Sequence, residues 1–238
     1  MGNSFSEEAS NGNKVMFYGD SLIEGYGVEV RDRFTTIFNN HLKEEKLNWQ
    51  VINSGKSGDL IQNTIERLIS TLKKETPHLV CLCIGGNDFF TDRWKELSSV
   101  KKELHDLINI IQSKNIPLVL IGILPPVPSD LMTEIDKIPE MSSQLAFFHM
   151  YESLAIELDL MFIKCIFEGI PLVDNTTLYN NIAQGYLSPK CIFEKEYFLD
   201  EAHPNSLGHK IIGDTLFCNL KEVLLEISTH SLGMKCFY

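Results

Sequence analysis

The chain has 238 residues, of which 44% are hydrophobic, so it can bury a full core as one large domain or two small ones. Its formal net charge is −11, from 21 basic and 32 acidic residues. This balance argues against a nucleic-acid-binding protein, which needs a basic surface stripe, and no apolar run approaches the length that spans a bilayer.

Residues 1–13 are polar, and we expect a flexible segment there, followed by one folded domain over residues 14–238. They lack the charged and apolar regions of a secretory signal, so we expect a cytoplasmic protein. The start "MGNSFS" also fits the short N-myristoylation pattern, with Gly2 and Ser6 in place. We favour a frayed polar terminus, because Glu7 and Glu8 supply no polybasic second membrane signal.

Beyond these residues, short apolar runs alternate with segments of helical spacing. The predicted strands cover residues 14–18, 49–53, 78–84, 117–121 and 160–165, and the predicted helices cover 32–46, 60–74, 98–114, 142–158 and 206–227. Continuous apolar strands such as "LVCLCI" suit a parallel sheet that is covered on both faces. The alternation therefore predicts an α/β fold, a doubly wound sandwich around a five-stranded parallel sheet.

Two long segments, residues 125–141 and 166–198, interrupt this alternation. Long loops in compact domains often act as lids or binding loops. A partly helical insertion packed on the body of the domain is the alternative, and the sequence leaves both open.

Polar or glycine-rich groups follow the first three strands and precede the last helix. In an open α/β sheet the carboxyl ends of the strands form the ligand-binding edge, so we expect these groups to meet there. They are Gly19-Asp20-Ser21, the stretch from Asn53 to Asp59, the stretch from Gly85 to Asp88, and the stretch from Asp200 to Asn205.

Several familiar motifs fail at these positions. "GKS" at residues 55–57 resembles the end of a Walker loop, but Gln50 stands where that loop needs a glycine. The sequence contains no complete dinucleotide fingerprint, no H-E-x-x-H motif and no G-x-S-x-G elbow. The six cysteines show no metal-ligand spacing, and Cys81 and Cys83 alternate in an apolar strand, so we expect buried thiols there.

A serine hydrolase fits the four groups better. Ser21 is a candidate nucleophile, and it needs an adjacent base, for which His203 is the candidate. Asp200 precedes His203 by three residues, so its carboxylate can accept the proton on the far imidazole nitrogen and fix the tautomer. The candidate donors for a tetrahedral oxyanion are the Ser21 N–H, the Gly58 N–H and the side-chain amide of Asn87.

In these blocks the chain resembles the SGNH hydrolases, also called GDSL-type esterases and lipases. "GDSL" at 19–22, "GGND" at 85–88 and "DEAHPN" at 200–205 match that family in order and spacing, from about Lys14 to Leu225. The resemblance implies a flavodoxin-like three-layer α/β/α sandwich without cofactor or metal. It also implies Ser21 as nucleophile, His203 as base and Asp200 as its orienting partner.

For the second block the family's S-G-D arrangement falls on residues 57–59, so we prefer Gly58 as the oxyanion donor, with Gly55 as the alternative. "GDSLIEGYGV" and "VINSGKSGD" look most like the bacterial acyl-CoA thioesterase, lysophospholipase and arylesterase branch. The missing signal peptide and the enlarged 166–198 segment depart from that branch.

Three hypotheses follow. The first is a serine esterase acting on a small-molecule acyl ester, thioester or lipid through an acyl-enzyme. The second is a carbohydrate O-acetylesterase with the same catalytic set, and the third is a non-catalytic binding protein on the same fold.

Some neighbouring residues have other expected roles. We expect Asp20 and Asp88 to accept backbone hydrogen bonds that hold their turns, and His209 to pack on or cap a helix. Phe147 and Phe148 are expected in the core. Leu22, Phe89, Phe90 and Trp94 flank the predicted site loops, where they can contact an acyl chain.

Overall fold

The computed structural model describes residues 12–123, 139–182 and 187–233, and its centre is a five-stranded parallel sheet. The strand order is β2-β1-β3-β4-β5, a flavodoxin-like order, and every neighbouring pair is parallel. This confirms the predicted fold class. The strands are β1 (Asn13–Gly19), β2 (Trp49–Gly55), β3 (Leu79–Cys83), β4 (Leu118–Ile121) and β5 (Met161–Ile163).

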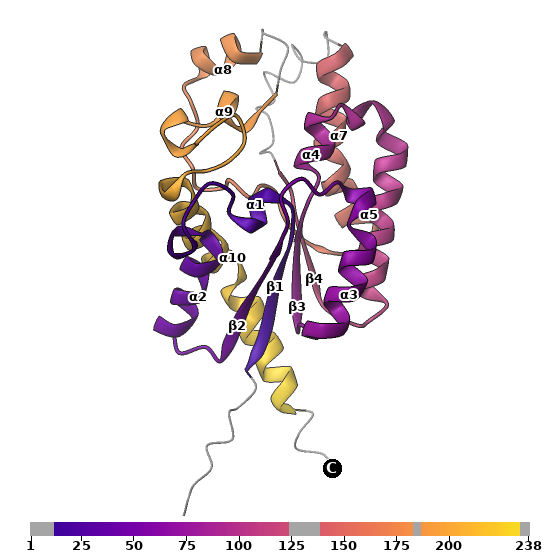
Figure 1. The fold of residues 1–238 in the computed structure, drawn as a ribbon, viewed down its shortest axis with the longest axis vertical. Helices are drawn as coiled ribbons and strands as arrows, with labels where there is room; N and C mark the ends of the chain where they lie inside the picture. The colour runs from indigo at the N-terminus through magenta and orange to yellow at the C-terminus, as the bar shows by residue number, and fades with distance from the viewer. Residues whose placement is uncertain (1–11, 124–138, 183–186, 234–238) are drawn as a thin grey trace, which may run out of the picture.

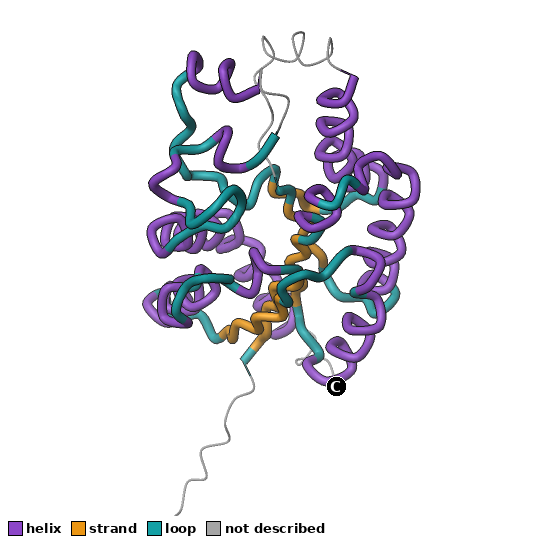
Figure 2. Tube along the Cα trace, turned by 45° about the horizontal axis from the view of Figure 1, so that its top comes forward, coloured by secondary structure: helices purple, strands orange, loops and turns teal. Residues whose placement is uncertain are grey.

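Helices cover both faces of the sheet (Figures 1 and 2). One face carries α2 (Phe34–Glu44) and α10 (Ser206–Gly233), and the other carries α3 (Ile65–Glu75), α5 (Leu97–Gln112) and α7 (Pro139–Glu157). The amphipathic helix α5 buries its apolar stripe, which consists of Val100, Leu104, Leu107, Ile108 and Ile111.

The aromatic part of the core shows how strand and helix patterns meet. Phe17 of β1 packs edge-on against two α2 side chains, with ring centroids 5.3 Å from Phe34 and 5.1 Å from Phe38. All three side chains are fully buried. Burial of side chains this large stabilises the fold by about 1.5–3 kcal/mol each.

Two short helices begin where the sequence predicts only turns. α1 (Ser21–Glu24) follows β1, and α4 (Gly86–Phe90) follows β3. Helices this short contain about one turn, so they leave no apolar periodicity to detect. α10 is also longer than predicted, since it continues beyond residue 227 to Gly233.

The described residues of the 166–198 segment, 166–182 and 187–198, form a partly helical insertion packed on the body, as the second of the two alternatives expected. It contains α8 (Asn175–Ile182), α9 (Pro189–Ile192) and a 3-10 turn (Lys195–Tyr197). Its rings at Phe167, Phe193 and Phe198 pack on one another with centroids 5.5–6.2 Å apart.

The described part of the chain contains no helix long and apolar enough to cross a membrane. The "MGNSFS" start with Gly2 and most of the 125–141 segment lie outside the described residues.

Candidate active site

The nucleophile candidate stands where β1 gives way to α1. Gly19 is required there for close packing, because a Cβ on it would lie 1.8 Å from the carbonyl oxygen of Cys83. Asp20 caps α1 by accepting the Leu22 N–H at 3.1 Å. Ser21 is therefore presented at the first position of a short helix, at the carboxyl end of β1.

Asp20 also connects the first and third sequence blocks. Its buried carboxylate accepts the N–H groups of Gly85 and Gly86, each at 3.3 Å. Burial raises the pKa of Asp20 to about 6, although the three backbone hydrogen bonds act in the opposite direction. Asp20 thus holds two turns together, as expected from the sequence.

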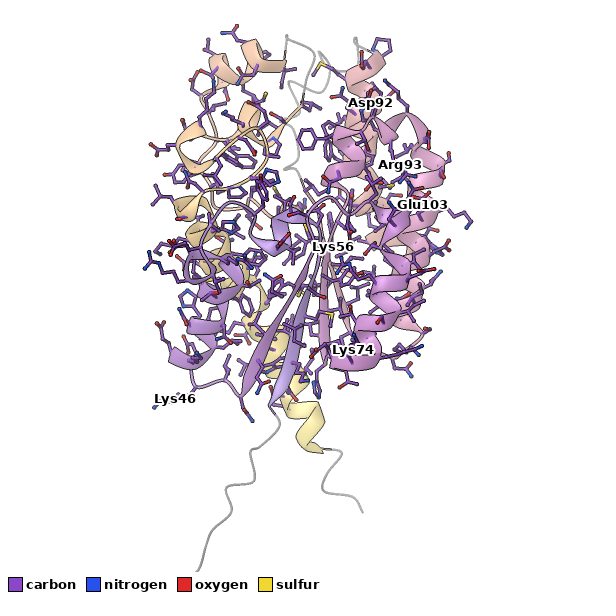
Figure 3. All side chains as sticks on the ribbon, viewed as in Figure 1. Lys46, Lys56, Lys74, Asp92, Arg93 and Glu103 are labelled. Carbon is purple, nitrogen blue, oxygen red and sulfur yellow. The ribbon has the colours of Figure 1, made fainter. Side chains whose placement is uncertain are left out.

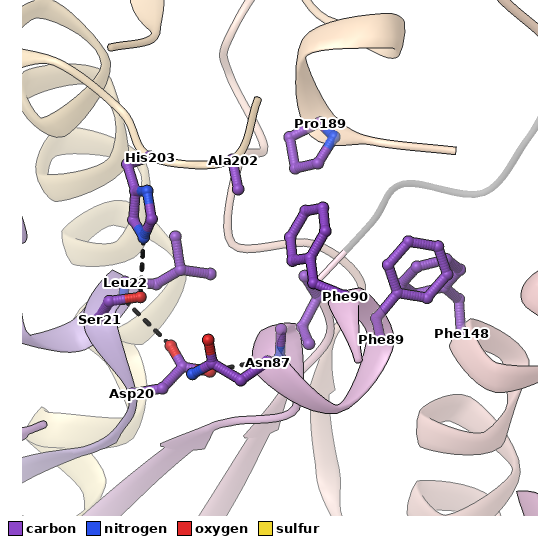
Figure 4. Close-up of a pocket in the computed structure, with 12 residues that line it drawn as sticks. Asp20, Ser21, Leu22, Asn87, Phe89, Phe90, Phe148, Pro189, Ala202 and His203 are labelled. Atoms are coloured by element: carbon purple, nitrogen blue, oxygen red, sulfur yellow. Dashed lines mark hydrogen bonds between the residues drawn. The ribbon is translucent and has the colours of Figure 1, made fainter. Parts of the chain in front are cut away.

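A continuous hydrogen-bond chain joins Ser21, His203 and Asp200. Ser21 Oγ lies 2.9 Å from His203 Nε2, a contact drawn in Figure 4. On the other side of the ring, His203 Nδ1 lies 2.8 Å from Asp200 Oδ2 and 3.0 Å from Oδ1. Residues 182 positions apart in the sequence thus adopt the geometry of a nucleophile, a base and an orienting acid.

The loop before α10 holds the Asp200 carboxylate in place. Asp200 Oδ1 accepts the backbone N–H groups of Ala202 at 2.9 Å and His203 at 2.8 Å. Partial burial acts to raise the pKa of Asp200, but these hydrogen bonds and the contact with the His203 ring outweigh it and lower the pKa. The carboxylate is therefore ionised at neutral pH and accepts a hydrogen bond from Nδ1–H, which leaves Nε2 available as a base.

Two of the sequence-predicted oxyanion donors lie on the short helix α4 and in the turn after β2. Asn87 Nδ2 donates to the carbonyl oxygen of Asp59 at 3.0 Å, and an amide nitrogen has a second hydrogen that can point elsewhere. Gly58, next to Asp59, has a φ of 82° and open space around its Cα. Gly55 is instead packed against α1, where an added Cβ would lie 2.0 Å from Glu24 N. The Gly55 N–H also donates to Asn53 Oδ1 at 3.0 Å, so Gly58 is the better candidate donor of the two.

An apolar pocket opens beside Ser21 Oγ (Figure 4). Its wall is mainly apolar and includes three phenylalanine side chains, in contrast to the polar triad. The lining comprises Asp20, Ser21, Leu22, Gly86, Asn87, Phe89, Phe90, Ile123, Phe148, Pro189, Ala202 and His203. Leu22, Phe89 and Phe90 were expected near the site. Trp94 is buried outside this lining.

Sequence reasoning missed two wall residues. Phe148 was expected in the core with Phe147; Phe147 is fully buried, whereas Phe148 is partly buried, packs against the core and also lines the pocket. Pro189 comes from the 166–198 insertion, and no local pattern links it to Ser21. An apolar residue in an apolar helix gives no sign of whether it faces the core or a pocket.

The other expected side-chain roles are visible as contacts. Asp88 is fully buried, accepts the Ile61 N–H at 2.9 Å and pairs with Arg93, which also binds Glu103 on α5 (Figure 3). Cys81 and Cys83 are buried free thiols. No group of three potential metal ligands occurs within residues 12–123, 139–182 and 187–233.

Comparison with known proteins shows the family of the chain. The model of the GDSL-like lipase/acylhydrolase family matches residues 17–211, a range that contains all four sequence blocks. Similar proteins include esterase TesA of Pseudomonas aeruginosa, 26% identical over 47% of this chain and 55% of that protein. The arylesterase of Vibrio mimicus is 29% identical over 48% of this chain and 56% of that protein. The chain therefore spans little more than half the length of these two relatives.

A longer match covers 91% of this chain and 87% of the thioesterase 1/protease 1/lysophospholipase L1 of Escherichia coli, at 22% identity. Among solved structures, TesA has a TM-score of 0.65 at 21% identity, covering 88% of this chain and 99% of that one. The psychrotrophic esterase EstA of Pseudoalteromonas has a TM-score of 0.64 at 18% identity, over 89% and 98% of the two chains. With the family model matching most of its length, the chain belongs to the GDSL-like lipase/acylhydrolase family.

Proposed function

We propose that this protein is a serine esterase that hydrolyses acyl esters or thioesters through an acyl-enzyme. The observation that carries the proposal is the unbroken chain of contacts from Ser21 Oγ through the His203 ring to the Asp200 carboxylate. We further propose that residues 14–238 act as one domain, because the site combines loops after β1, β2 and β3 with the loop before α10.

Acylation begins when Ser21 Oγ attacks the carbonyl carbon and His203 Nε2 takes the hydroxyl proton. The carbonyl π electrons move to oxygen, and the resulting oxyanion is stabilised by the Ser21 N–H, the Gly58 N–H and the Asn87 amide. When the tetrahedral adduct collapses, the bond to the leaving group breaks, and His203 gives its proton to the leaving alcohol or thiol. Water then attacks the acyl carbon while His203 takes its proton. The bond to Ser21 Oγ breaks, His203 returns the proton to Oγ, and the carboxylic acid leaves.

The apolar pocket supports an acyl chain as the group bound beside Ser21. Phe89, Phe90 and Phe148 offer aromatic surface, and few polar groups apart from the catalytic ones line the wall. Burial of each methylene from water contributes about 0.8 kcal/mol, so a longer chain gains affinity until it fills the pocket. The names of the relatives (esterase, arylesterase, and thioesterase with lysophospholipase) are compatible with such substrates.

The test is a series of p-nitrophenyl esters from acetate to laurate, measured beside a lysophospholipid, an acyl-CoA and acetylated xylan. We expect turnover of the acyl substrates, a rise in kcat/KM with chain length from acetate, and loss of turnover in Ser21→Ala. Ser113→Ala, which changes an exposed serine at the end of α5, is the matched control and should match the wild type.

Two results would contradict the proposal. Undiminished turnover by Ser21→Ala would remove the serine mechanism. Deacetylation of xylan without cleavage of longer acyl chains would instead identify a carbohydrate O-acetylesterase.

A further inference from the structure

The turn that carries Gly58 is not held by packing of Gly58 itself. It spans residues 56–59, closed by a hydrogen bond from Asp59 N to the Lys56 carbonyl oxygen at 3.3 Å, at the sheet edge where Figure 3 labels Lys56. No atom lies within 4 Å of a Cβ added to Gly58, whose φ of 82° is one that other residues rarely adopt. The direction of the Gly58 N–H therefore depends on its two neighbours, Ser57 and Asp59.

Glu24 holds the Ser57 side. Its Oε2 accepts the backbone N–H of Ser57 at 2.7 Å and also the Ser57 hydroxyl. The hydrogen bond from the Ser57 hydroxyl and, to a smaller extent, the one from the Ser57 N–H lower the pKa of Glu24. The acceptor is therefore a carboxylate at neutral pH. Glu24 is the last residue of the short helix that begins at Ser21, so this contact joins the nucleophile helix to the Gly58 turn.

Arg67 of α3 holds the Asp59 side. Its Nε donates to Asp59 Oδ2 at 2.7 Å, and its two terminal nitrogens donate to the Ser54 carbonyl at 2.8 Å and the Gly19 carbonyl at 2.9 Å. The guanidinium lies 4.1 Å above the Tyr18 ring. One planar cation thus connects the ends of β1 and β2 with the residue after Gly58.

Asp59 links this cation to the second oxyanion donor as well. The Asp59 side chain binds Arg67, while its backbone carbonyl accepts one amide hydrogen of Asn87 at 3.0 Å. The orientation of the Asn87 amide, and so the direction of its remaining hydrogen, depends on where Asp59 stands.

We propose that Glu24 and Arg67 are positioning residues that fix the oxyanion donors Gly58 and Asn87 from both sides of one turn. This proposal rests on the proposed esterase function. Neither residue lines the pocket, and each acts through a contact with Ser57 or Asp59, the two neighbours of Gly58. An acid that follows the nucleophile within one helical turn thereby controls a donor in another loop.

The first test is Glu24→Ala with a soluble p-nitrophenyl ester. We expect kcat to fall about ten- to a hundred-fold, because a misplacement of about 1 Å in a catalytic group costs up to that factor, while KM changes less than about three-fold. Glu24→Gln should recover most of kcat, since an amide oxygen can accept both Ser57 hydrogen bonds. Affinity for butylboronic acid, which forms a tetrahedral adduct with a nucleophilic serine, should fall by the same factor as kcat.

Glu44→Ala is the matched control. It removes one acidic charge from the end of α2, near the amino-terminal end of β2 and so far from the catalytic edge, and should leave kcat and boronate affinity unchanged. If Glu24→Ala only lowers Tm, with wild-type kcat and boronate affinity well below that Tm, the positioning role is overturned. Wild-type turnover by Ser21→Ala would overturn the esterase function and this proposal together, whereas an inactive Ser21→Ala beside an unaffected Glu24→Ala would overturn this proposal alone.

The Arg67 half is tested by coupling to Asn87. Arg67→Lys keeps the charge but not the fork that reaches three acceptors, so kcat should fall at least about ten-fold. In an Asn87→Ala background the same change should cost less, because part of its effect passes through the lost amide. If Arg67→Lys lowers kcat by the same factor in the wild type and in Asn87→Ala, the proposed role of Arg67 is overturned. Should Arg67→Lys not fold, Asp59→Asn, which removes the charged acceptor of Arg67 together with the exposed Lys56 ion pair, should show the same coupling.

Discussion

His209 offers a test of the structure through the pH dependence of stability. It lies in the first turns of α10, 1% exposed, and its Nδ1 accepts the Phe34 N–H at 3.3 Å. The neutral ring must therefore carry its proton on Nε2. Protonation of Nδ1 would remove the acceptor for Phe34 and place a charge in a buried site beside Arg33. The pattern thus confirms the expected packing and capping role of His209.

The size of the effect follows from the pKa. Burial, followed by the charges of Arg33 and His203, lowers the pKa of His209 from 6.5 to about 4. Because the folded-state pKa lies below the unfolded one, the stabilising contribution is complete above pH 6.5 and is lost as the pH falls toward 4. Linkage between these two values gives a loss of about 2 kcal/mol between about pH 7.5 and about pH 5.

The assay is urea unfolding of the wild type and His209→Asn at these two pH values. Asn places an amide oxygen near the position of Nδ1, so it can accept the Phe34 N–H, but it does not titrate. The wild type should lose about 2 kcal/mol more than the variant on acidification. The assay compares the two proteins because Asp20, whose pKa is raised to about 6, adds to the free energy of unfolding of both as the pH falls over part of the same range. Equal losses in both proteins would refute the buried, neutral His209.

Three further outcomes test the site. Asn87→Ala should lower kcat about 10²–10³-fold with a smaller change in KM, and wild-type kcat would exclude its amide as an oxyanion donor. Gly55→Ala should lower Tm far more than Gly58→Ala, because its Cβ would lie 2.0 Å from Glu24 N, whereas open space at Gly58 leaves only backbone strain of about 1–2 kcal/mol. Equal melting temperatures would contradict these distinct roles of the two glycines. Phe148→Ala should move the preferred acyl chain to greater length, whereas Phe147→Ala should cost about 3–5 kcal/mol of stability without changing that preference. An unchanged preference in Phe148→Ala would remove it from the acyl pocket.

Much of the fold follows from sequence because the strands are apolar on both faces and end abruptly. A run such as "LVCLCI" stops at two glycines, and the polar residues after each run share one edge of a parallel sheet. That rule alone brings Ser21, Gly58 and Asn87 to the same side. The spacing of Asp200 and His203 supplies the remaining local contact, since three residues bring two side chains within reach.

Other parts of the site depend on tertiary packing that no local pattern records. α1 is one turn long, and its apolar residues do not repeat. From the sequence, Arg67 looks like an exposed charge on a helix surface. In the fold, α3 lies against the sheet so that the Arg67 guanidinium reaches the Gly19 and Ser54 carbonyls. Glu24 and Ser57 are 33 residues apart and meet only because Gly55 lets α1 approach β2.

The most direct test of the central proposal is covalent modification of Ser21 in the folded protein. After treatment with a fluorophosphonate, intact-mass and peptide mass spectrometry should find one adduct, on Ser21, in proportion to the loss of esterase turnover. His203→Ala should react far more slowly, because the proton of Ser21 then has no base to accept it. Full turnover by protein modified at Ser21, or equal labelling of wild type and His203→Ala, would contradict the account.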